Sequence, residues 1–266
     1  MLRNLKDLEG CAVGASDGVI GHVRDCYFDD AAWVIRYLIV DTGEPPRHHV
    51  LVSPIAVIEP DWQARIIPVR LTREQVKHCP DIDTDKPVSR QQEMGYLGYY
   101  GYGNYWGGSG LWGAGLYPDI LQGGLQEKTN GGASNGGHQH VHGNDPHLRS
   151  ANAVMRYYVH ASDGDIGHVD GFLVEERTWA IRYLIVNTSN WWLGHQVLIA
   201  PPWINEVNWL ESMVMVGLTR EAIKAAPAYD SSANLDREQE GMVHAHYGRG
   251  AYWAEQDKSR TAASRP

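Results

Sequence analysis

An internal repeat constrains the fold of this 266-residue chain more than any other feature of its sequence. Residues 15–43 recur at 161–189, and sixteen of the twenty-nine aligned positions are identical without a gap. After one inserted residue the similarity continues at an offset of 147, so each copy spans about 95 residues, an ordinary domain size. A chemical site that serves both copies should be retained in both, which makes the repeat a filter for function.

The segments outside the repeat differ from it in composition. The stretch between the copies is rich in Gly, Asn, Ser and His, which is typical of a flexible linker. We therefore expect four parts: a first domain with an aromatic arm over 1–106, a Gly/His-rich linker over 107–150, a second domain with an aromatic arm over 151–256, and a polar tail over 257–266.

Within each copy the sequence predicts several short strands followed by a helix. The Asp17-Gly18 turn precedes an expected strand over 21–28, and residues 33–40 should form a long strand that is apolar on both faces. Thr72 is the expected N-cap of the helix. The pattern favours a mainly β fold of two small antiparallel barrels or sandwiches, each closed by a helix and followed by an aromatic arm.

Two runs of residues resemble a known family. They are Ala-Ser-Asp-Gly-Val-Ile-Gly-His-Val at 15–23 and Trp-Val-Ile-Arg-Tyr-Leu-Ile-Val at 33–40; residues 190–204 and 218–221 add to the likeness. Together they are similar to the PRC-barrel domain, named for the cytoplasmic domain of the photosynthetic reaction centre H subunit and also found in a ribosome maturation factor. The resemblance covers both copies and leaves the linker unexplained.

This resemblance implies a small β-barrel that serves as a docking or regulatory module, with no general set of catalytic residues. Stand-alone domains of this kind commonly pair, so the duplication suggests an intramolecular pair with near-twofold symmetry. The apolar strand at 33–40 and the aromatic arms would supply the pairing surface.

Composition narrows the class of function. A formal net charge of −9 argues against a phosphate-binding surface, so we expect no nucleic-acid partner. No apolar run approaches the roughly 18 residues that a membrane span needs. The first residues lack the apolar core of a signal peptide, and the three cysteines do not make a disulfide framework, so we expect a cytoplasmic protein.

Acid, histidine and serine residues near the first turn are retained in both copies. A hydrolase centred on Asp17 and His22, or on Asp163 and His168, is one interpretation. The serine lies directly beside the aspartate, however, and no Gly-x-Ser-x-Gly elbow is present. We favour a turn followed by a histidine at a strand start.

Other retained polar residues also allow two interpretations. Arg36 and Arg182 lie inside apolar strands, so each should pair internally with an acid or contact an anion or a partner carboxylate. His48 and His195 align at a variable loop and could touch a partner. The candidate acids for the two arginines are Asp17/Asp163, Asp29/Glu175 and Asp30/Glu176.

The aromatic arms and the linker supply the remaining candidates. The arms read as hydrophobic clamps between copies or subunits, although stacking on bases or sugars is the alternative. The histidines of the linker could bind zinc, nickel or copper, and a solvated linker is the favoured interpretation. The arm residues are Tyr100, Trp106, Tyr247 and Trp253, and the histidines are His138, His140, His142 and His147.

Taken together, these features predict a non-enzymatic protein-binding, scaffold or regulatory protein without a cofactor. Its partner is expected to be a protein, and a homo-oligomer is possible. The alternatives are a metal sensor or store that uses the His-rich linker, and the hydrolase described above.

Overall fold

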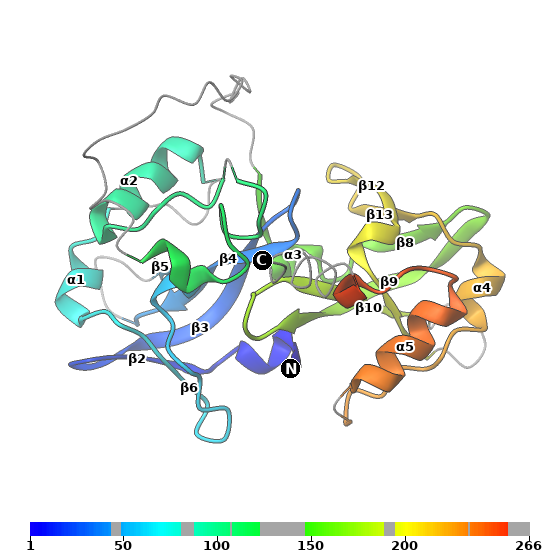
Figure 1. Cartoon of the computed structure of the whole chain (residues 1–266), viewed down its shortest axis with the longest axis horizontal. Helices are drawn as coiled ribbons and strands as arrows, with labels where there is room; N and C mark the ends of the chain where they lie inside the picture. Colours follow the sequence, from blue (N-terminus) through cyan, green and yellow to red (C-terminus); the bar gives the residue numbers. More distant parts are fainter. Residues whose placement is uncertain are drawn as a thin grey trace, which may run out of the picture. The chain divides into compact units, whose positions relative to one another are not determined.

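The computed structural model describes residues 1–43, 49–80, 88–106, 108–122, 147–188, 195–233 and 235–254. The chain divides into two compact units (Figure 1). The first unit holds Met1, Arg3–Val154 and Val174–Arg182; the second holds Leu2, Met155–Leu173 and Tyr183–Pro266. The tip of the second repeat's long hairpin, Val174–Arg182, therefore belongs to the first unit.

The first repeat forms strands β2 to β6 and ends in two helices. Its elements are β2 (Ala12–Ala15), β3 (Gly18–Asp29), β4 (Val34–Asp41), β5 (His49–Val52), β6 (Ile66–Pro68), α1 (Arg73–Lys77) and α2 (Arg90–Tyr100). The 3-10 turns of the first unit are η1 (Leu5–Leu8), η2 (Pro54–Ala56) and η3 (Pro118–Leu121). The strand order is β5-β4-β3-β2-β6, and β7 (Leu148–Ser150) also pairs with β3.

The second repeat builds a similar series of elements, with β12 as an additional strand. They are α3 (Ala151–Val154), β8 (Tyr158–Ala161), β9 (Gly164–Glu175), β10 (Ile181–Asn187), β11 (Gln196–Ile199), η4 (Pro201–Trp203), β12 (Ile204–Asn208), β13 (Met213–Val216), α4 (Arg220–Lys224) and α5 (Arg237–His246). The sheet order is β11-β10-β9-β8-β13-β12, and β1 (Leu2–Asn4) pairs with β9.

The mainly β prediction is confirmed, but the expected antiparallel barrels are not what the strands form. β2 pairs with β6 in parallel, and β8 pairs with β13 in parallel, so both sheets are mixed. Their described strand pairings run from one edge to the other and do not close into barrels. Local alternation predicts strands well, but it carries no information on which distant strand becomes a neighbour.

A glycine in each long strand permits its close approach to the next strand. A Cβ on Gly21 in β3 would lie 2.1 Å from the Asp41 carbonyl oxygen, and one on Gly167 in β9 would lie 1.9 Å from that of Asn187. Both distances are far inside van der Waals contact. The retained Gly-His-Val motif therefore includes a position that no larger residue can take without moving the backbone.

The strand expected at 33–40 is buried as predicted. All residues of β4 except the last are buried, and β10 shows nearly the same pattern. β-branched and aromatic side chains suit such a strand because they pack on both faces of a covered sheet. The core of the first unit forms around β4, where Tyr37 is 1% exposed. The core of the second unit forms around β10, where Tyr183 is fully buried.

The helix caps follow the prediction closely. Thr72 accepts a hydrogen bond from the Gln75 backbone, and the Gln75 side chain completes a capping box. In the second repeat Thr219 caps α4 alone, as the Ala222 at the third position predicts. Capping boxes also begin α2 at Ser89 and α5 at Asp236.

Two tryptophans end the turns of the long hairpins in an uncommon conformation. Trp33 and Trp179 are equivalent in the repeat, and both have positive φ, 54° and 59°. The Ile35 N–H donates to the Trp179 carbonyl at 2.9 Å, and the Ile181 N–H donates to the Trp33 carbonyl at 2.7 Å. These two bonds are equivalent under exchange of the repeats, and all four residues lie in the first unit.

Part of the expected linker is packed in the first unit. Trp112 is completely buried, and its indole N–H donates to the Thr178 carbonyl at 2.8 Å. The Gln122 side chain donates to the Ile55 carbonyl at 2.6 Å. The glycine-rich composition gave no sign of this packing, because two anchoring side chains are enough to hold the segment. Residues 123–146, the remaining linker, lie outside the described part.

Candidate functional site

A glutamate with no exposed surface lies at the centre of the first unit. Glu93 is on α2 and is 0% exposed. The Tyr37 hydroxyl, from β4, donates to its Oε1 at 3.0 Å, and the Tyr105 hydroxyl donates to the same oxygen at 2.5 Å. Arg90 Nη1 donates to Oε2 at 3.2 Å, and His147 Nε2 lies 2.7 Å from that oxygen. We call these five residues the first glutamate cluster.

The first glutamate cluster leaves its carboxylate saturated. A carboxylate has about four lone-pair sites, and four donors reach Glu93. Arg90 also donates to the Tyr105 hydroxyl at 2.8 Å, which fixes both side chains. Such a group has little capacity to accept a substrate proton, because any acceptance would displace a hydrogen bond inside the fold.

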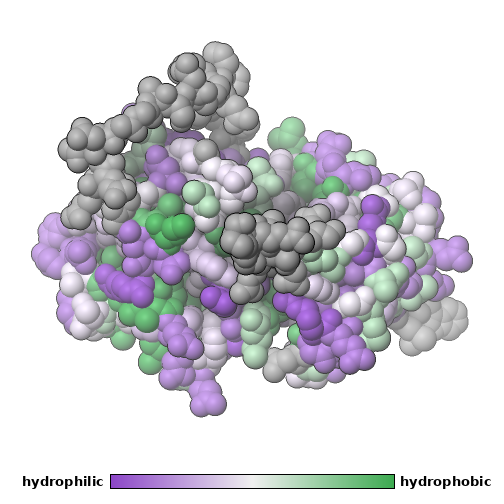
Figure 2. Space-filling view, in the orientation of Figure 1, coloured by the Kyte–Doolittle hydropathy of each residue, from purple (hydrophilic) through white to green (hydrophobic). Residues whose placement is uncertain are grey.

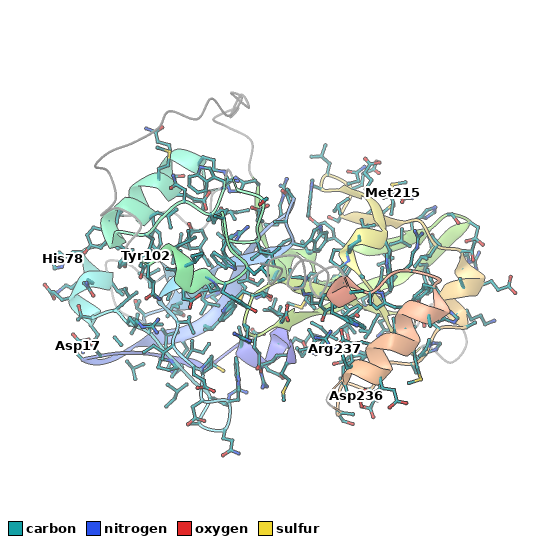
Figure 3. All side chains as sticks on the ribbon, in the orientation of Figure 1. Asp17, His78, Tyr102, Met215, Asp236 and Arg237 are labelled. Atoms are coloured by element: carbon teal, nitrogen blue, oxygen red, sulfur yellow. The ribbon has the colours of Figure 1, made fainter. Side chains whose placement is uncertain are left out.

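The second unit repeats this arrangement at equivalent positions. The Tyr183 hydroxyl donates to Glu240 Oε2 at 3.1 Å, and the Tyr252 hydroxyl donates to it at 3.0 Å. Arg237 Nη1 lies 3.1 Å from Glu240 Oε1 and donates to the Tyr252 hydroxyl at 2.9 Å. With His244, these residues form the second glutamate cluster; Figure 3 shows Arg237 near the start of α5.

The histidines of the two clusters come from different places in the sequence. His147 precedes β7, whereas His244 lies on α5 itself, where the first repeat has Leu97. His244 Nε2 lies 2.9 Å from the Tyr183 hydroxyl. Each cluster therefore combines one glutamate, one arginine, two tyrosines and one histidine, although only four of the five members are aligned in the repeat.

Burial controls the protonation of the tyrosines. It raises the pKa of Tyr37 and of Tyr105 well above the usual value, and the adjacent Glu93 raises both further. Burial and Glu240 raise the pKa of Tyr183 in the same way. These phenols stay protonated and act as hydrogen-bond donors, so the clusters tie strand, helix and arm together.

The arginine of each cluster also holds the tryptophan of the aromatic arm. The Arg90 guanidinium lies 4.5 Å from the Trp106 ring centre, and that of Arg237 lies 4.5 Å from the Trp253 ring centre. Trp106 also meets Tyr105 edge-on at 4.9 Å. Two predicted arm residues thus pack on the clusters of their own repeats.

The other two predicted arm residues pack against aromatic rings of their own units. Tyr100 lies 4.9 Å from the Tyr96 ring, and Tyr247 lies 4.9 Å from the Trp203 ring. Burial raises the pKa of both phenols. The described contacts of all four arm residues are with side chains of the same unit.

The retained aspartates have a structural contact in each repeat. Asp17 Oδ1 accepts the Arg73 N–H at 2.7 Å, and Asp163 Oδ1 accepts the Arg220 N–H at 2.7 Å. Figure 3 places Asp17 at the outer end of the β2–β3 hairpin, near α1. The same contact in both repeats joins this turn to the start of a helix. The aspartate accepts a backbone N–H of the first helical turn, which has no acceptor within the helix.

The predicted histidines do not gather into a site. His22 is exposed on β3 and His168 is half-buried on β9. Among the described residues, no hydrogen bond joins His22 to Asp17 or His168 to Asp163. The His195 backbone carbonyl accepts from the Thr188 hydroxyl at 2.8 Å. His48 lies outside the described residues.

Both arginines inside the strands contact an acid named in advance from the sequence. Arg36 Nη2 lies 3.6 Å from Asp29, and Arg182 Nε lies 2.9 Å from Glu175. The guanidinium of Arg36 also lies 4.0 Å from the Tyr105 ring centre. Burial alone would raise the pKa of Glu175, but the Arg182 guanidinium outweighs it, and the pKa is lowered.

Most of the histidines that were candidate metal ligands lie outside the described residues. His138, His140 and His142 lie outside the described residues, and His147 contacts Glu93. Within the described ranges, no group of three or more His, Cys, Asp or Glu side chains is placed to hold a metal ion. All three cysteines are buried, and none of them forms a disulfide.

Sequence reasoning missed Tyr37, Glu93 and their equivalents Tyr183 and Glu240 as members of one network. The signal was present, because tyrosine, arginine and glutamate are all retained at matching positions. What the sequence lacks is the packing of α2 on β4, which brings residues 56 positions apart into contact.

Neither family models nor curated proteins identify this arrangement. No model of a protein family matches the chain, and no curated protein matches it.

None of the helices in the described part of the chain is long and apolar enough to cross a membrane.

Proposed function

We propose that this protein is a non-enzymatic binding or scaffold protein, built from two PRC-barrel-like repeats that pair within one chain and dock a protein partner. One observation carries the proposal. Three pairs of polar residues that are retained in both repeats form hydrogen bonds or ion pairs within their own units. They are Asp17/Asp163, Arg90/Arg237 and Glu93/Glu240.

The pairing part of the proposal is supported by the hairpin tips. The reciprocal bonds from Ile35 to Trp179 and from Ile181 to Trp33 have the form expected when two equivalent segments meet about a local twofold axis. Trp33 and Trp179 hold a costly backbone conformation at this point. Both repeats therefore keep this conformation at the place where the tips meet.

The docking part is supported by an exposed apolar segment in the first unit. Leu116, Tyr117 and Ile120 are 40%, 38% and 56% exposed and lie around η3. A Cβ on Gly115 would lie 2.8 Å from Ile120 Cδ1, so that side chain is supported from behind. Figure 2 shows apolar patches among hydrophilic residues on the surface of the first unit. Large apolar side chains on a fixed segment are typical of a protein-binding surface.

The test is affinity capture by the full chain from an extract of its native cell, read by quantitative mass spectrometry. We expect a specific protein to be enriched by the wild type and its recovery to fall about tenfold with Ile120→Asp. Asp119→Ala, at the exposed neighbouring position, is the matched control and should capture the protein normally.

Circular dichroism should show that both variants keep the wild-type fold. Equal capture by Ile120→Asp and wild type would reject the η3 surface. Enrichment of no protein over a capture with the unfolded chain would reject the docking function itself.

A further inference from the structure

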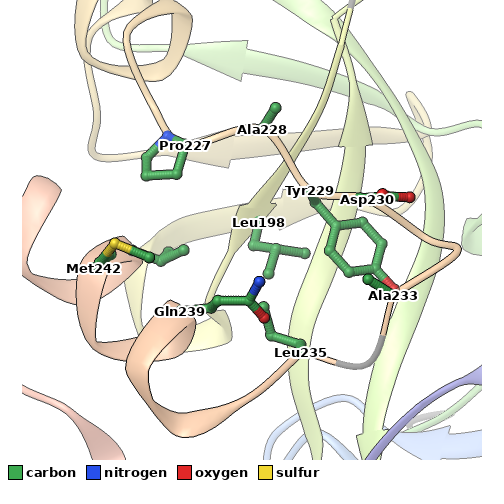
Figure 4. A pocket seen from close by; sticks show the side chains of 10 residues that line it. Leu198, Pro227, Ala228, Tyr229, Asp230, Ala233, Leu235, Gln239 and Met242 are labelled. Atoms are coloured by element: carbon green, nitrogen blue, oxygen red, sulfur yellow. The ribbon is translucent and has the colours of Figure 1, made fainter.

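The second unit contains a pocket of about 110 Å³ between β11, α5 and the loop that joins α4 to α5 (Figure 4). Its walls are mainly apolar, with Leu198, Leu235, Met242 and Val243 among them. A cavity of about 150 Å³ lined by such side chains takes up benzene. The pocket in this protein is smaller, but its apolar lining is of the same kind and suits one small aromatic ring.

The two repeats differ at one of the residues that line this pocket. At the position of Val243 the first repeat has Tyr96, whose buried hydroxyl donates to the Leu51 carbonyl at 3.0 Å and accepts the Ser53 N–H at 3.2 Å. Valine lacks this phenol. Trp203 replaces part of it, because its ring lies as close to Tyr247 as Tyr96 lies to Tyr100. Leu198 and Val243 both line the pocket.

The pocket also offers a fixed hydrogen-bond donor. Gln239 Oε1 accepts the Asp236 N–H at 3.0 Å as part of the capping box of α5. This bond fixes the amide orientation, so Nε2 points the other way, toward the interior of the pocket (Figure 4). A ligand atom that meets it must be an acceptor.

An acceptor lies on the strand beneath. Thr188 and His195 are hydrogen-bonded across β10 and β11, so alternation turns the polar backbone groups of Leu198 away from β10. Leu198 corresponds to Leu51, whose carbonyl accepts the Tyr96 hydroxyl in the first repeat. A donor and an acceptor at one end of an apolar pocket suit a hydroxyl group.

We infer that this pocket is a binding site for a small uncharged phenol. The ring lies among Leu198, Leu235 and Val243, and the hydroxyl accepts from Gln239 Nε2 and donates to the Leu198 carbonyl. The second repeat thus takes from outside the kind of group that Tyr96 supplies within the first. This site is independent of the proposed docking surface, which lies in the other unit.

The test is a titration of the full chain with p-cresol, the analogue of a tyrosine side chain, followed by the methionine methyl signals in NMR. Met242 lines the pocket and is 52% exposed, and Met94, 56% exposed in the first unit, is the internal control. We expect a saturable shift of the Met242 methyl alone. Toluene, which lacks the hydroxyl, should bind about tenfold more weakly.

Two variants separate the steps of the argument. Val243→Tyr fills the pocket with the residue of the first repeat and should weaken p-cresol binding at least about tenfold. Gln239→Glu keeps the oxygen that caps α5 but removes the donor, so p-cresol should lose its advantage over toluene. If Val243→Tyr fails to fold, Gln239→Glu decides alone.

Three results would overturn the inference. They are a Met242 methyl that does not shift or does not saturate, toluene binding equal to p-cresol binding in the wild type, and undiminished p-cresol preference in Gln239→Glu.

Discussion

Single residues in this chain are retained twice for reasons that local patterns only partly reveal. Gly18 and Gly164 have φ of 137° and 135°, which an Asp-Gly turn predicts. Gly21 and Gly167 have ordinary backbone angles and are needed for a different reason, the close approach of the next strand. The sequence shows the retention of both kinds, but only the fold separates conformation from packing.

Substitution at the crossing position should be costly. Gly21→Ala places a methyl group against the Asp41 carbonyl, and we expect the free energy of unfolding to fall by about 1–3 kcal/mol. Urea denaturation measures it. Gly98→Ala, on α2 with no atom within 4 Å of an added Cβ, is the control and should leave stability unchanged or raise it by up to about 1 kcal/mol. Equal effects of the two changes would contradict the packing argument.

His244 gives a prediction about pH. Burial lowers its pKa below the ordinary 6.5, so between that value and the lowered pKa the unfolded chain binds a proton that the folded chain does not. Stability from the neutral ring is therefore present above about pH 6.5 and is lost as the pH falls toward the lowered pKa.

The matched variant is His244→Leu, which installs the residue that the first repeat has at Leu97. Between about pH 7.5 and about pH 5.5 the wild type should lose more unfolding free energy than this variant. Chemical denaturation at both pH values measures the difference, and His78→Gln, at an exposed position, controls for the removal of one histidine. Parallel pH profiles of wild type and His244→Leu would show that the ring carries no such linkage.

At the scale of elements, the glutamate clusters fix a helix and an aromatic arm to a sheet. α2 is only weakly amphipathic, so its docking depends on Glu93 and on aromatic contacts as well as on a continuous apolar stripe. Tyr37 supplies the strand end of the network and Tyr105 the arm end. A change of the Glu93 carboxylate should therefore loosen both the helix and the aromatic arm.

Glu93→Gln removes the charge but keeps the shape of the side chain. We expect a loss of about 1–3 kcal/mol in unfolding free energy, because Arg90 loses its ionic partner and His147 loses contact with a carboxylate oxygen. Tryptophan fluorescence should also change, since Trp106 stacks on Arg90. Gln91→Ala, at the exposed position two residues away, should do neither. A stable Glu93→Gln protein with unchanged fluorescence would show that the cluster does not hold the arm.

The sequence predicted individual helices and strands far better than it predicted which strands pair with one another. The cap at Thr72 and the buried strand at 33–40 rest on interactions within a few residues, and both were confirmed. The parallel β2–β6 and β8–β13 pairings depend on chain paths of some 50 residues, which periodicity does not encode. Periodicity also did not predict the candidate site, because Tyr37 and Glu93 come into contact only through tertiary packing.

At the scale of the whole molecule, the two repeats give two versions of one framework. The clusters, caps and strand-crossing glycines are kept in both repeats. The second repeat exchanges Tyr96 for Val243, and its hairpin tip, Val174–Arg182, is counted in the first unit. This pattern favours an assembled surface with local specialisation over two copies of an active site.

The central claim is that the hairpin tips of the two repeats pair within one chain. Val34 and Ala180 are direct partners in this pairing and lie between its two hydrogen bonds, a position where Cα atoms stand about 4.5 Å apart and a disulfide fits. The measurement is peptide mapping of Val34→Cys/Ala180→Cys after mild oxidation, with the mass of the intact chain. The account predicts a 34–180 disulfide within a chain of unchanged monomeric mass, and none in either single variant. Absence of that disulfide, or its formation only between chains, would contradict the account.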